Sequence, residues 1–136
     1  MASGIYNRFK ANLMNKVVDL EADVIKVMLL NNSHAFDAAH NTVSEIVANE
    51  ITGTGYTVGG GVLAGMAVTQ GTTTKFDATD LTWPNSNFSA YFGVIYDASL
   101  VGSDLIACLD FGGAVVPSNG GTLTIQWDAA GIITLA

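Results

Sequence analysis

The sequence predicts a mainly β fold, a sandwich or flattened barrel of about seven to eight strands with two short helices near the N-terminus. Three observations support this class: a pair of apolar strands between residues 88 and 111, an alternating strand near the C-terminus, and turn signals at short intervals. No linker or repeat interrupts the chain. We therefore expect one domain over residues 1–136, with residues 1–22 forming an N-terminal helix or arm and a connector.

The pair of strands at residues 88–111 is the expected centre of the core. Side chains of a strand alternate between its two faces. One face of the first strand would carry Phe88, Ala90, Phe92, Val94 and Tyr96, and the other Tyr91, Gly93 and Ile95. The second strand, from Leu105 to Phe111, follows the polar turn 97–104 and repeats the pattern. Because both faces are apolar, both must be covered by other parts of the protein.

The N-terminal part predicts a helix that leads into a central strand. Ser3 can cap a helix with an apolar stripe of Ile5, Phe9 and Leu13, ending near residues 15–16. Residues 17–22 form a connector. Residues 23–30 are apolar enough on both faces to form a central strand.

A loop at residues 31–42 precedes the second predicted helix, at residues 42–50. Thr42 and Glu45 have the spacing of a capping box, and Val43, Ile46 and Val47 would form the buried edge. The glycines in residues 52–61 then indicate a loop, which leads into a strand at residues 62–69.

The last part of the chain predicts strands at residues 73–78 and 80–83, a turn at 84–87, and a C-terminal hairpin. Leu123, Ile125 and Trp127 alternate with polar residues, which gives one buried face with Trp127 directed inward. The turn at residues 128–131 would join this strand to a final strand at 132–135.

Composition narrows the classes of function. Hydrophobic residues make up 49% of the chain and charged ones 12%, against a usual charged share of roughly 25%. Such a surface must be carried by Thr, Ser, Asn and Gly or be covered by another protein, as is common in adhesins, sandwich modules and virion proteins. The net charge is −7, distributed as +1 over residues 1–26 and −8 over the rest, which argues against binding to nucleic acid. We also expect no signal peptide and no contact with a membrane.

Candidate catalytic and metal-binding groups are sparse. His34 and His40, with Asp37 between them, resemble metal ligands, but a spacing of six residues places the imidazoles on no common helical face. Cys108 lies among apolar residues and is expected to be a buried hydrophobe. The glycine run 53–61 lacks the ending of a P-loop. We therefore expect no metal and no cofactor.

Carboxylate pairs and aromatic residues leave two further possibilities. Asp77 with Asp80, or Asp97 with Asp104, could approach each other, but Asp is common in turns and no His or Lys stands near to form a nucleophile–base pair. We expect no enzymatic activity. Aromatic side chains could line a carbohydrate groove, although their positions on strands favour the core for most of them: Tyr56, Trp83, Tyr91, Phe92, Tyr96 and Trp127.

Several blocks of the sequence resemble a family of small structural proteins encoded by tailed bacteriophages. They are Tyr6-Asn7 with the short helix that follows, residues 23–30, 47–60, 76–83, 91–97 and 106–112, and the final block 121–134 with its Ile125-Gln126-Trp127-Asp128 run. The resemblance implies a virion component, in the first place a head decoration or cement protein that binds the major capsid protein on the outside of the capsid after synthesis in the host cytoplasm. It supplies no catalytic residues. A neck, tail or fibre component and a carbohydrate-binding β module remain alternatives.

We also expect a small homo-oligomer, in the first place a trimer. A domain this small with 49% hydrophobic residues leaves apolar surface exposed, and such surface usually marks contacts; three-fold positions follow from the family resemblance alone. Residues 1–10 could be an arm whose removal leaves a folded domain, or else a helix covering its own sheet, and the 53–61 loop could adapt its backbone to a partner. The expected capsid or subunit contacts are Ile5, Tyr6, Arg8, Phe9, Lys10, Gly53, Gly55, Tyr56, Gly59 and Gly60.

Overall fold

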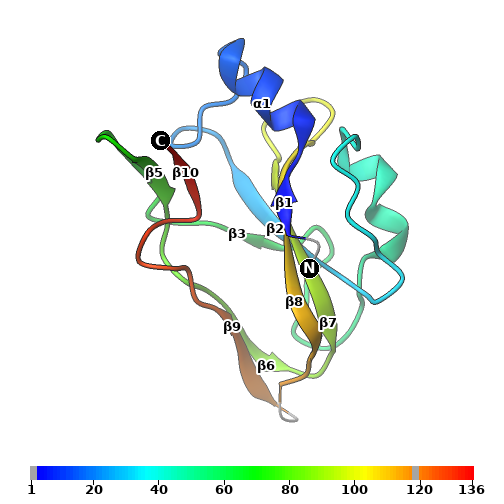
Figure 1. Ribbon diagram of the computed structural model, residues 1–136. Coiled ribbons are helices and arrows are strands. Elements are labelled where there is room, and N and C mark those ends of the chain that lie inside the picture. The colour runs from blue at the N-terminus through cyan, green and yellow to red at the C-terminus, as the bar shows by residue number, and fades with distance from the viewer. Residues whose placement is uncertain (1–2, 118–119) are drawn as a thin grey trace.

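The computed structural model describes residues 3–117 and 120–136 and is mainly β, with antiparallel sheets, as the sequence predicts (Figure 1). The five-stranded sheet has the order β1-β8-β7-β2-β3, a three-stranded sheet has the order β10-β5-β4, and β6 pairs with β9. The strands of the large sheet are β1 (Gly4–Ile5), β2 (Ile25–Leu30), β3 (Gly61–Val62), β7 (Ala90–Asp97) and β8 (Asp104–Val115). Those of the smaller sheets are β4 (Ala67–Thr69), β5 (Thr74–Asp77), β6 (Leu81–Ser86), β9 (Gly121–Ile125) and β10 (Ile133–Leu135).

The pairing of the predicted central strands is confirmed, but part of the predicted face assignment is wrong. Phe92, Val94 and Tyr96 belong to one core cluster, whereas Phe88 and Ala90 belong to the other, because the register shifts between Ala90 and Phe92. Strands β7 and β8 pair antiparallel around the turn at residues 97–104, and β2 pairs with the other edge of β7. The register of β7 and β8 shifts between Ile95 and Tyr96, which face Ala107 and Leu105. Ile106 is the extra residue, so Ile106 and Ala107 both belong to the same core cluster.

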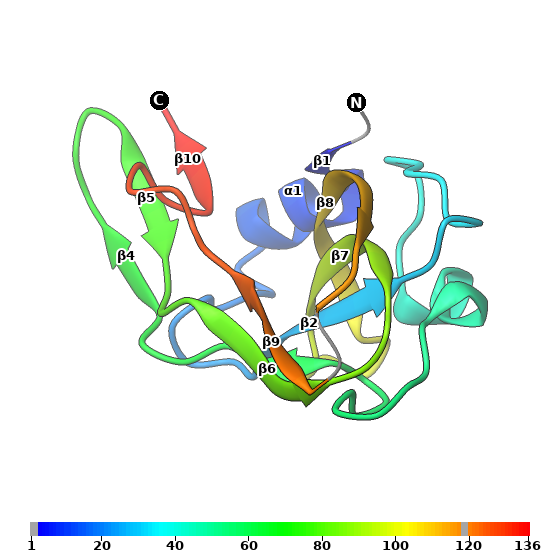
Figure 2. The ribbon, with the colours of Figure 1, turned by 90° about the horizontal axis from the view of Figure 1, so that it is seen from below.

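Both faces of the large sheet are covered, as two apolar faces require. On one face, a core cluster joins β2, β7 and β8 to the two smaller sheets. On the other face, a second cluster joins Met28, Val94 and Tyr96 to the segment 31–50 through Ile46 and the partly buried Phe36. Figures 1 and 2 show the smaller sheets on one side of β2, β7 and β8 and the 31–50 segment on the other.

The first helix begins later than predicted. Helix α1 spans Asn7–Met14, while Gly4 and Ile5 form β1 and pair with Cys108 and Ala107. Ser3 does not cap the helix, because its hydroxyl oxygen accepts a hydrogen bond from the backbone N–H of Asp110. Edge pairing with β8 therefore replaces the predicted first turn of helix. This helix is too short to cross a membrane, and no longer apolar helix occurs in the described part of the chain.

The prediction of a second helix is wrong. Residues 42–50 contain two single 3₁₀ turns, η1 (Val43–Glu45) and η2 (Val47–Asn49). Glu45 accepts from the backbone N–H of Asn41, and Thr42 contacts Ser44, so no capping box forms. The segment is tied to β2 at its far end, where Ile51 N–H donates to the Leu29 carbonyl. Ile46 is buried as expected, whereas Val47 is exposed.

Two strand boundaries also differ from the prediction. The strand predicted at residues 62–69 is divided into β3 and β4, which belong to different sheets, with Gly65 at φ +64° between them. Strand β6 continues into the predicted turn at 84–87 and ends at Ser86, with a register shift between Trp83 and Ser86.

The predicted C-terminal hairpin is wrong. Strand β9 pairs with β6, and β10 pairs with β5, so the two strands lie in separate sheets. The turn before Gly131 is present, since Gly131 N–H donates to the Asp128 carbonyl. It directs the chain to the edge of β5 and not back along β9, because Ile132 N–H donates to the Phe76 carbonyl.

Candidate functional site

The predicted contact residues of the N-terminal segment divide into buried and exposed ones. Tyr6 and Phe9 are core residues with 0% and 3% of their surface exposed, so this fold leaves them no surface for a partner. Ile5 is partly buried in β1, while Arg8 and Lys10 are exposed on α1. The segment is thus a helix covering its own sheet, the second of the two alternatives. Met1 and Ala2 of the predicted arm lie outside the described residues.

Helix α1 is held to the sheet by Asp104, the first residue of β8. The Oδ2 atom of Asp104 accepts from Arg8 Nε at 3.0 Å and from Asn12 Nδ2 at 2.7 Å. Asn12 and Asp104 are both buried, so these hydrogen bonds compensate for the loss of water around the carboxylate. Arg8 is therefore committed, at least in part, to its own chain.

The glycine-rich loop is fixed by its neighbours. Glu50 Oε2 accepts from Tyr56 Oη at 2.6 Å and from Gly59 N–H at 2.7 Å. Tyr56 Oη in turn accepts from Leu29 N–H of β2, and the Tyr96 hydroxyl donates to the Gly59 carbonyl. Burial, followed by the hydrogen bond to Glu50, raises the pKa of Tyr56, so the phenol stays protonated as the donor this network needs.

The glycines of this loop allow its backbone to lie close to neighbouring segments of the chain. At Gly60, with φ +92°, a Cβ atom would collide with the carbonyl of Val27. At Gly53 and Gly55 a Cβ would come within 3 Å of Phe88 or of the Asn85 carbonyl. Packing against the protein's own strands thus accounts for these three glycines, and adaptation of the loop to a partner stays a prediction.

An apolar groove of about 440 Å³ lies between α1, the connector that follows it and the three-stranded sheet. We call it the helix-end groove. Its walls include Leu13, Val68 and Leu135, which are exposed by 36%, 43% and 55%. The complete lining is Phe9, Leu13, Lys16, Val18, Asp19, Leu20, Val68, Thr74, Lys75, Phe76, Ile133 and Leu135.

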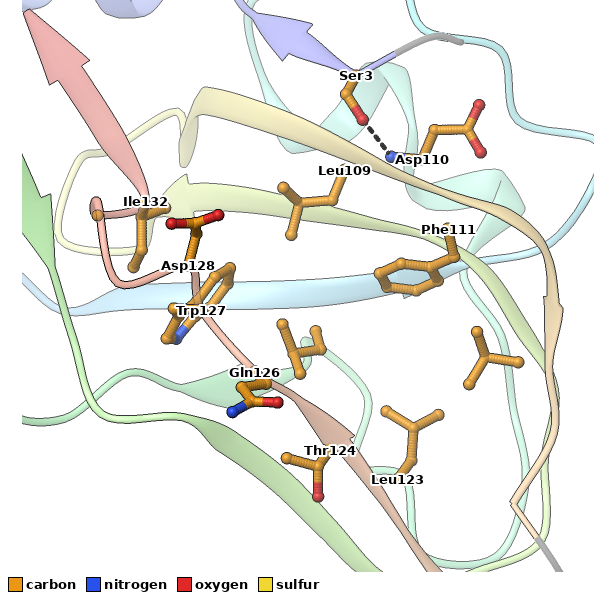
Figure 3. A pocket seen from close by; sticks show the side chains of 13 residues that line it. Ser3, Leu109, Asp110, Phe111, Leu123, Thr124, Gln126, Trp127, Asp128 and Ile132 are labelled. Carbon is orange, nitrogen blue, oxygen red and sulfur yellow. Dashed lines mark hydrogen bonds between the residues drawn. The ribbon is translucent and has the colours of Figure 1, made fainter.

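A second groove, of about 390 Å³, lies between β8 and the segment 123–132 (Figure 3). We call it the Trp127 groove. Leu109 and Phe111 point into it from β8, while the Asp110 side chain points away. The lining consists of Ser3, Leu109, Asp110, Phe111, Val115, Leu123, Thr124, Ile125, Gln126, Trp127, Asp128, Gly131 and Ile132.

Trp127 is held in place in this groove. Its indole Nε1 donates to the Thr79 carbonyl at 3.2 Å, and its backbone N–H donates to Asp80 Oδ1 at 2.9 Å. Beside it, Asp128 Oδ1 accepts from the Ala130 N–H at 2.8 Å. The prediction that Trp127 is directed inward is only partly met, since the ring packs against the core but is partly exposed to the groove.

Among the aromatic residues considered for a carbohydrate groove, Trp127 alone lines this one. Trp83 and Tyr96 are buried, and Tyr56 packs against Trp83 and Phe88. The sequence pattern does not identify Phe111 as a groove residue, because it predicts a core position for Phe111 in the central pair. It lies on β8 beyond the residues that pair regularly with β7, and only the length of the second apolar strand could have indicated this.

Cys108, His34 and Tyr6 form a buried polar cluster within the second core. Cys108 Sγ lies 3.8 Å from His34 Nε2. Burial raises the pKa of the Cys108 thiol to about 12 and lowers the pKa of His34. Both shifts favour the neutral pair, and Cys108 is 1% exposed. This pair therefore lacks the thiolate and the access that a nucleophile needs.

The structure brings together Asp97 and Asp104, one of the two carboxylate pairs considered. Asp97 and Asp104 are directly opposite in the β7–β8 ladder. Burial raises the pKa of Asp97 to about 7, and a hydrogen bond with Asp23 is the next largest cause. Asp104 is occupied by Arg8 and Asn12, so the pair has structural partners on both sides.

The histidine cluster does not form a metal site in the residues that the structure describes, where no group of three or more suitable ligands meets. His40 Nε2 lies 4.0 Å from Asp37 Oδ2, while His34 turns inward to Cys108. The two imidazoles thus have separate neighbours.

Comparisons of the chain with protein-family models, with curated proteins and with solved structures give no match.

Proposed function

We propose that this protein is a structural component of a tailed-bacteriophage virion, a decoration protein that binds the major capsid protein on the outside of the head as a small homo-oligomer, in the first place a trimer. The resemblance of the sequence blocks is the origin of this proposal. It includes the absence of enzymatic activity, of a cofactor and of contact with nucleic acid or membrane.

The observation that carries the proposal is the helix-end groove. Apolar side chains on a small soluble domain are normally buried, and a gathered group of exposed ones usually marks a contact. Leu13, Val68 and Leu135 line the groove, and all three are at least one-third exposed. A second copy placed here would remove these side chains from water.

Attachment to the head is assigned to the exposed cations of α1. Lys10 lies on the outer side of the helix, and Arg8 is exposed outside its contact with Asp104. The rest of the protein is acidic, so these residues are the part suited to an acidic patch on a shell. Salt should weaken attachment only in part, because few charges take part.

The finer fold assignment belongs to the same proposal. A sandwich or flattened barrel is supported by the core cluster that joins β7 and β8 of the large sheet to β5, β6, β9 and β10 of the smaller ones.

The number of copies in purified virions tests the proposal. A decoration protein on every capsid position is present in hundreds of copies, whereas neck and tail proteins are present in few. Quantitative mass spectrometry of purified particles from the phage that encodes the chain should therefore give a high copy number relative to the major capsid protein. A low copy number would favour the neck, tail or fibre alternative, and absence from the particle would refute a virion role.

A further inference from the structure

We propose that the Trp127 groove is a binding site for a neutral saccharide. This inference concerns a different part of the surface from the helix-end groove and from Lys10, and it stands whether or not the protein decorates a capsid.

The first element of the site is a preformed aromatic wall. Sugar rings present faces of C–H groups that pack on aromatic side chains, and the polar edges of the ring need hydrogen bonds. Trp127 is fixed by bonds to Thr79 and Asp80, so its ring position requires little ordering when a ligand binds. Leu109 and Phe111 point into the groove from β8 and supply further apolar surface (Figure 3).

The second element is a rim of two uncharged polar side chains and one carboxylate. Thr124, Gln126 and Asp128 are exposed residues on the β9 side of the groove. Asp128 uses Oδ1 for the turn at Ala130, and its second carboxylate oxygen can accept from a ligand hydroxyl. The Gln126 amide can both donate and accept, which matches the hydroxyl groups of a sugar.

Charge and size then select the class of saccharide. Among the described residues that line the groove there is no Lys or Arg, whereas Asp128 contributes a carboxylate, in a chain of net charge −7. An anionic sugar or a phosphate would meet repulsion from the Asp128 carboxylate. A volume of about 390 Å³ lies near the lower end of the range for small-molecule sites, which suits a short saccharide.

The test is binding of methyl glycosides of common neutral hexoses and N-acetylhexosamines to the wild-type protein. Saturation-transfer difference NMR should show transfer to ring protons of at least one of them, and a titration should saturate at millimolar concentration. Sialic acid and tetramethylammonium serve as the anionic and cationic probes, and neither should compete.

Variants locate the binding. Gln126→Ala and Asp128→Asn should each weaken binding by about tenfold, the effect of losing one good hydrogen bond. Gln70→Ala is the matched control, because Gln70 is the other glutamine of the chain, is exposed, and does not line the groove. Both Gln126 and Asp128 are exposed, and circular dichroism should show that these variants remain folded.

Three outcomes would overturn the proposal. One is the absence of saturable binding to every neutral glycoside tested. Another is binding that the Gln126 and Asp128 variants leave unchanged, which would place the sugar elsewhere. The last is competition by tetramethylammonium, which would make the groove a site for cations, recognised by Trp127 and the carboxylates.

Discussion

Asp97 shows how a single buried carboxyl group couples this fold to pH. It is 0% exposed at the end of β7, and its Oδ1 accepts from the backbone N–H of Ser99. The charged groups that face it are Asp23, which precedes β2, and Asp104 on β8. The Asp104 carboxylate is stabilised by Arg8 and Asn12. The cost of burying a charged carboxylate therefore raises the pKa of Asp97.

We predict that Asp97 makes the protein less stable as pH rises through neutrality. Its pKa is raised from 3.8 to about 7, so between these values the folded state holds a proton that the unfolded state releases. The free energy of unfolding must therefore fall as pH rises from about 4 to about 7, and this contribution then levels off. Asp97→Asn keeps the acceptor for Ser99 and cannot ionise.

The measurement is the melting temperature of the wild type and of Asp97→Asn across this pH range. The variant should gain stability relative to the wild type as pH rises, with most of the gain complete by about pH 8. A difference that stays constant with pH would contradict the raised pKa of Asp97.

At the scale of elements, the backbone of the glycine loop at residues 53–61 packs closely against the backbone of β2. Gly60 and Gly112 both have positive φ, +92° and +78°, but their surroundings differ. A Cβ at Gly60 would overlap the backbone of Val27 and Met28, whereas no heavy atom of the described residues lies within 4 Å of an ideal Cβ at Gly112.

We predict that Gly60→Ala costs more than about 3 kcal/mol of unfolding free energy, because it adds steric overlap with a central strand to the backbone strain. Gly112→Ala should cost only about 1–2 kcal/mol, the expense of a left-handed conformation alone. Urea denaturation of both variants measures the difference. Equal losses of unfolding free energy in the two variants would mean that the loop can move away from β2, and would support the prediction of an adaptable loop.

The elements that were predicted correctly are those whose signal is local. Apolar runs on both faces identified β2, β7 and β8, and short polar turns delimited β5. The errors arise where distant pairing overrides local pattern. Gly4 and Ile5 look like the start of a helix until β8 offers an edge, and β9 looks like half of a hairpin although its partner is β6.

The same reasoning explains which site residues could be predicted. The apolar stripe that predicts α1 also predicts that Phe9 is buried, and Phe9 is buried in the structure. Predicting Phe9 as a contact with a partner therefore conflicts with the helix pattern. The grooves could not have been found in this way, because each joins segments far apart in the sequence. Phe111 and Trp127, for example, line the same groove although Phe111 lies on β8 of the large sheet and Trp127 follows β9, which pairs with β6.

At the scale of the whole molecule, the exposed edges of the three-stranded sheet bear on how copies could associate. Strand β4 is an edge strand, but Val68 N–H already donates to Glu21 Oε2 at 3.0 Å. A charged side chain on an edge opposes the addition of a further strand. Association through side chains in the helix-end groove is therefore favoured over extension of the sheet at β4.

We predict that Leu13→Gln combined with Leu135→Gln abolishes the homo-oligomer and leaves a folded monomer. Both side chains line the helix-end groove and are at least one-third exposed, so their replacement by a polar side chain should cost little folding stability while removing apolar contact area. Sedimentation equilibrium measures the change from trimer to monomer. Met14→Gln is the control on the same helix, since Met14 is 89% exposed and does not line the groove, and the Met14→Gln variant should remain a trimer.

If the double variant stays trimeric, copies meet elsewhere and the groove is free for the capsid. If the wild type is itself monomeric, the exposed apolar surface has another partner and the predicted homo-oligomer is wrong.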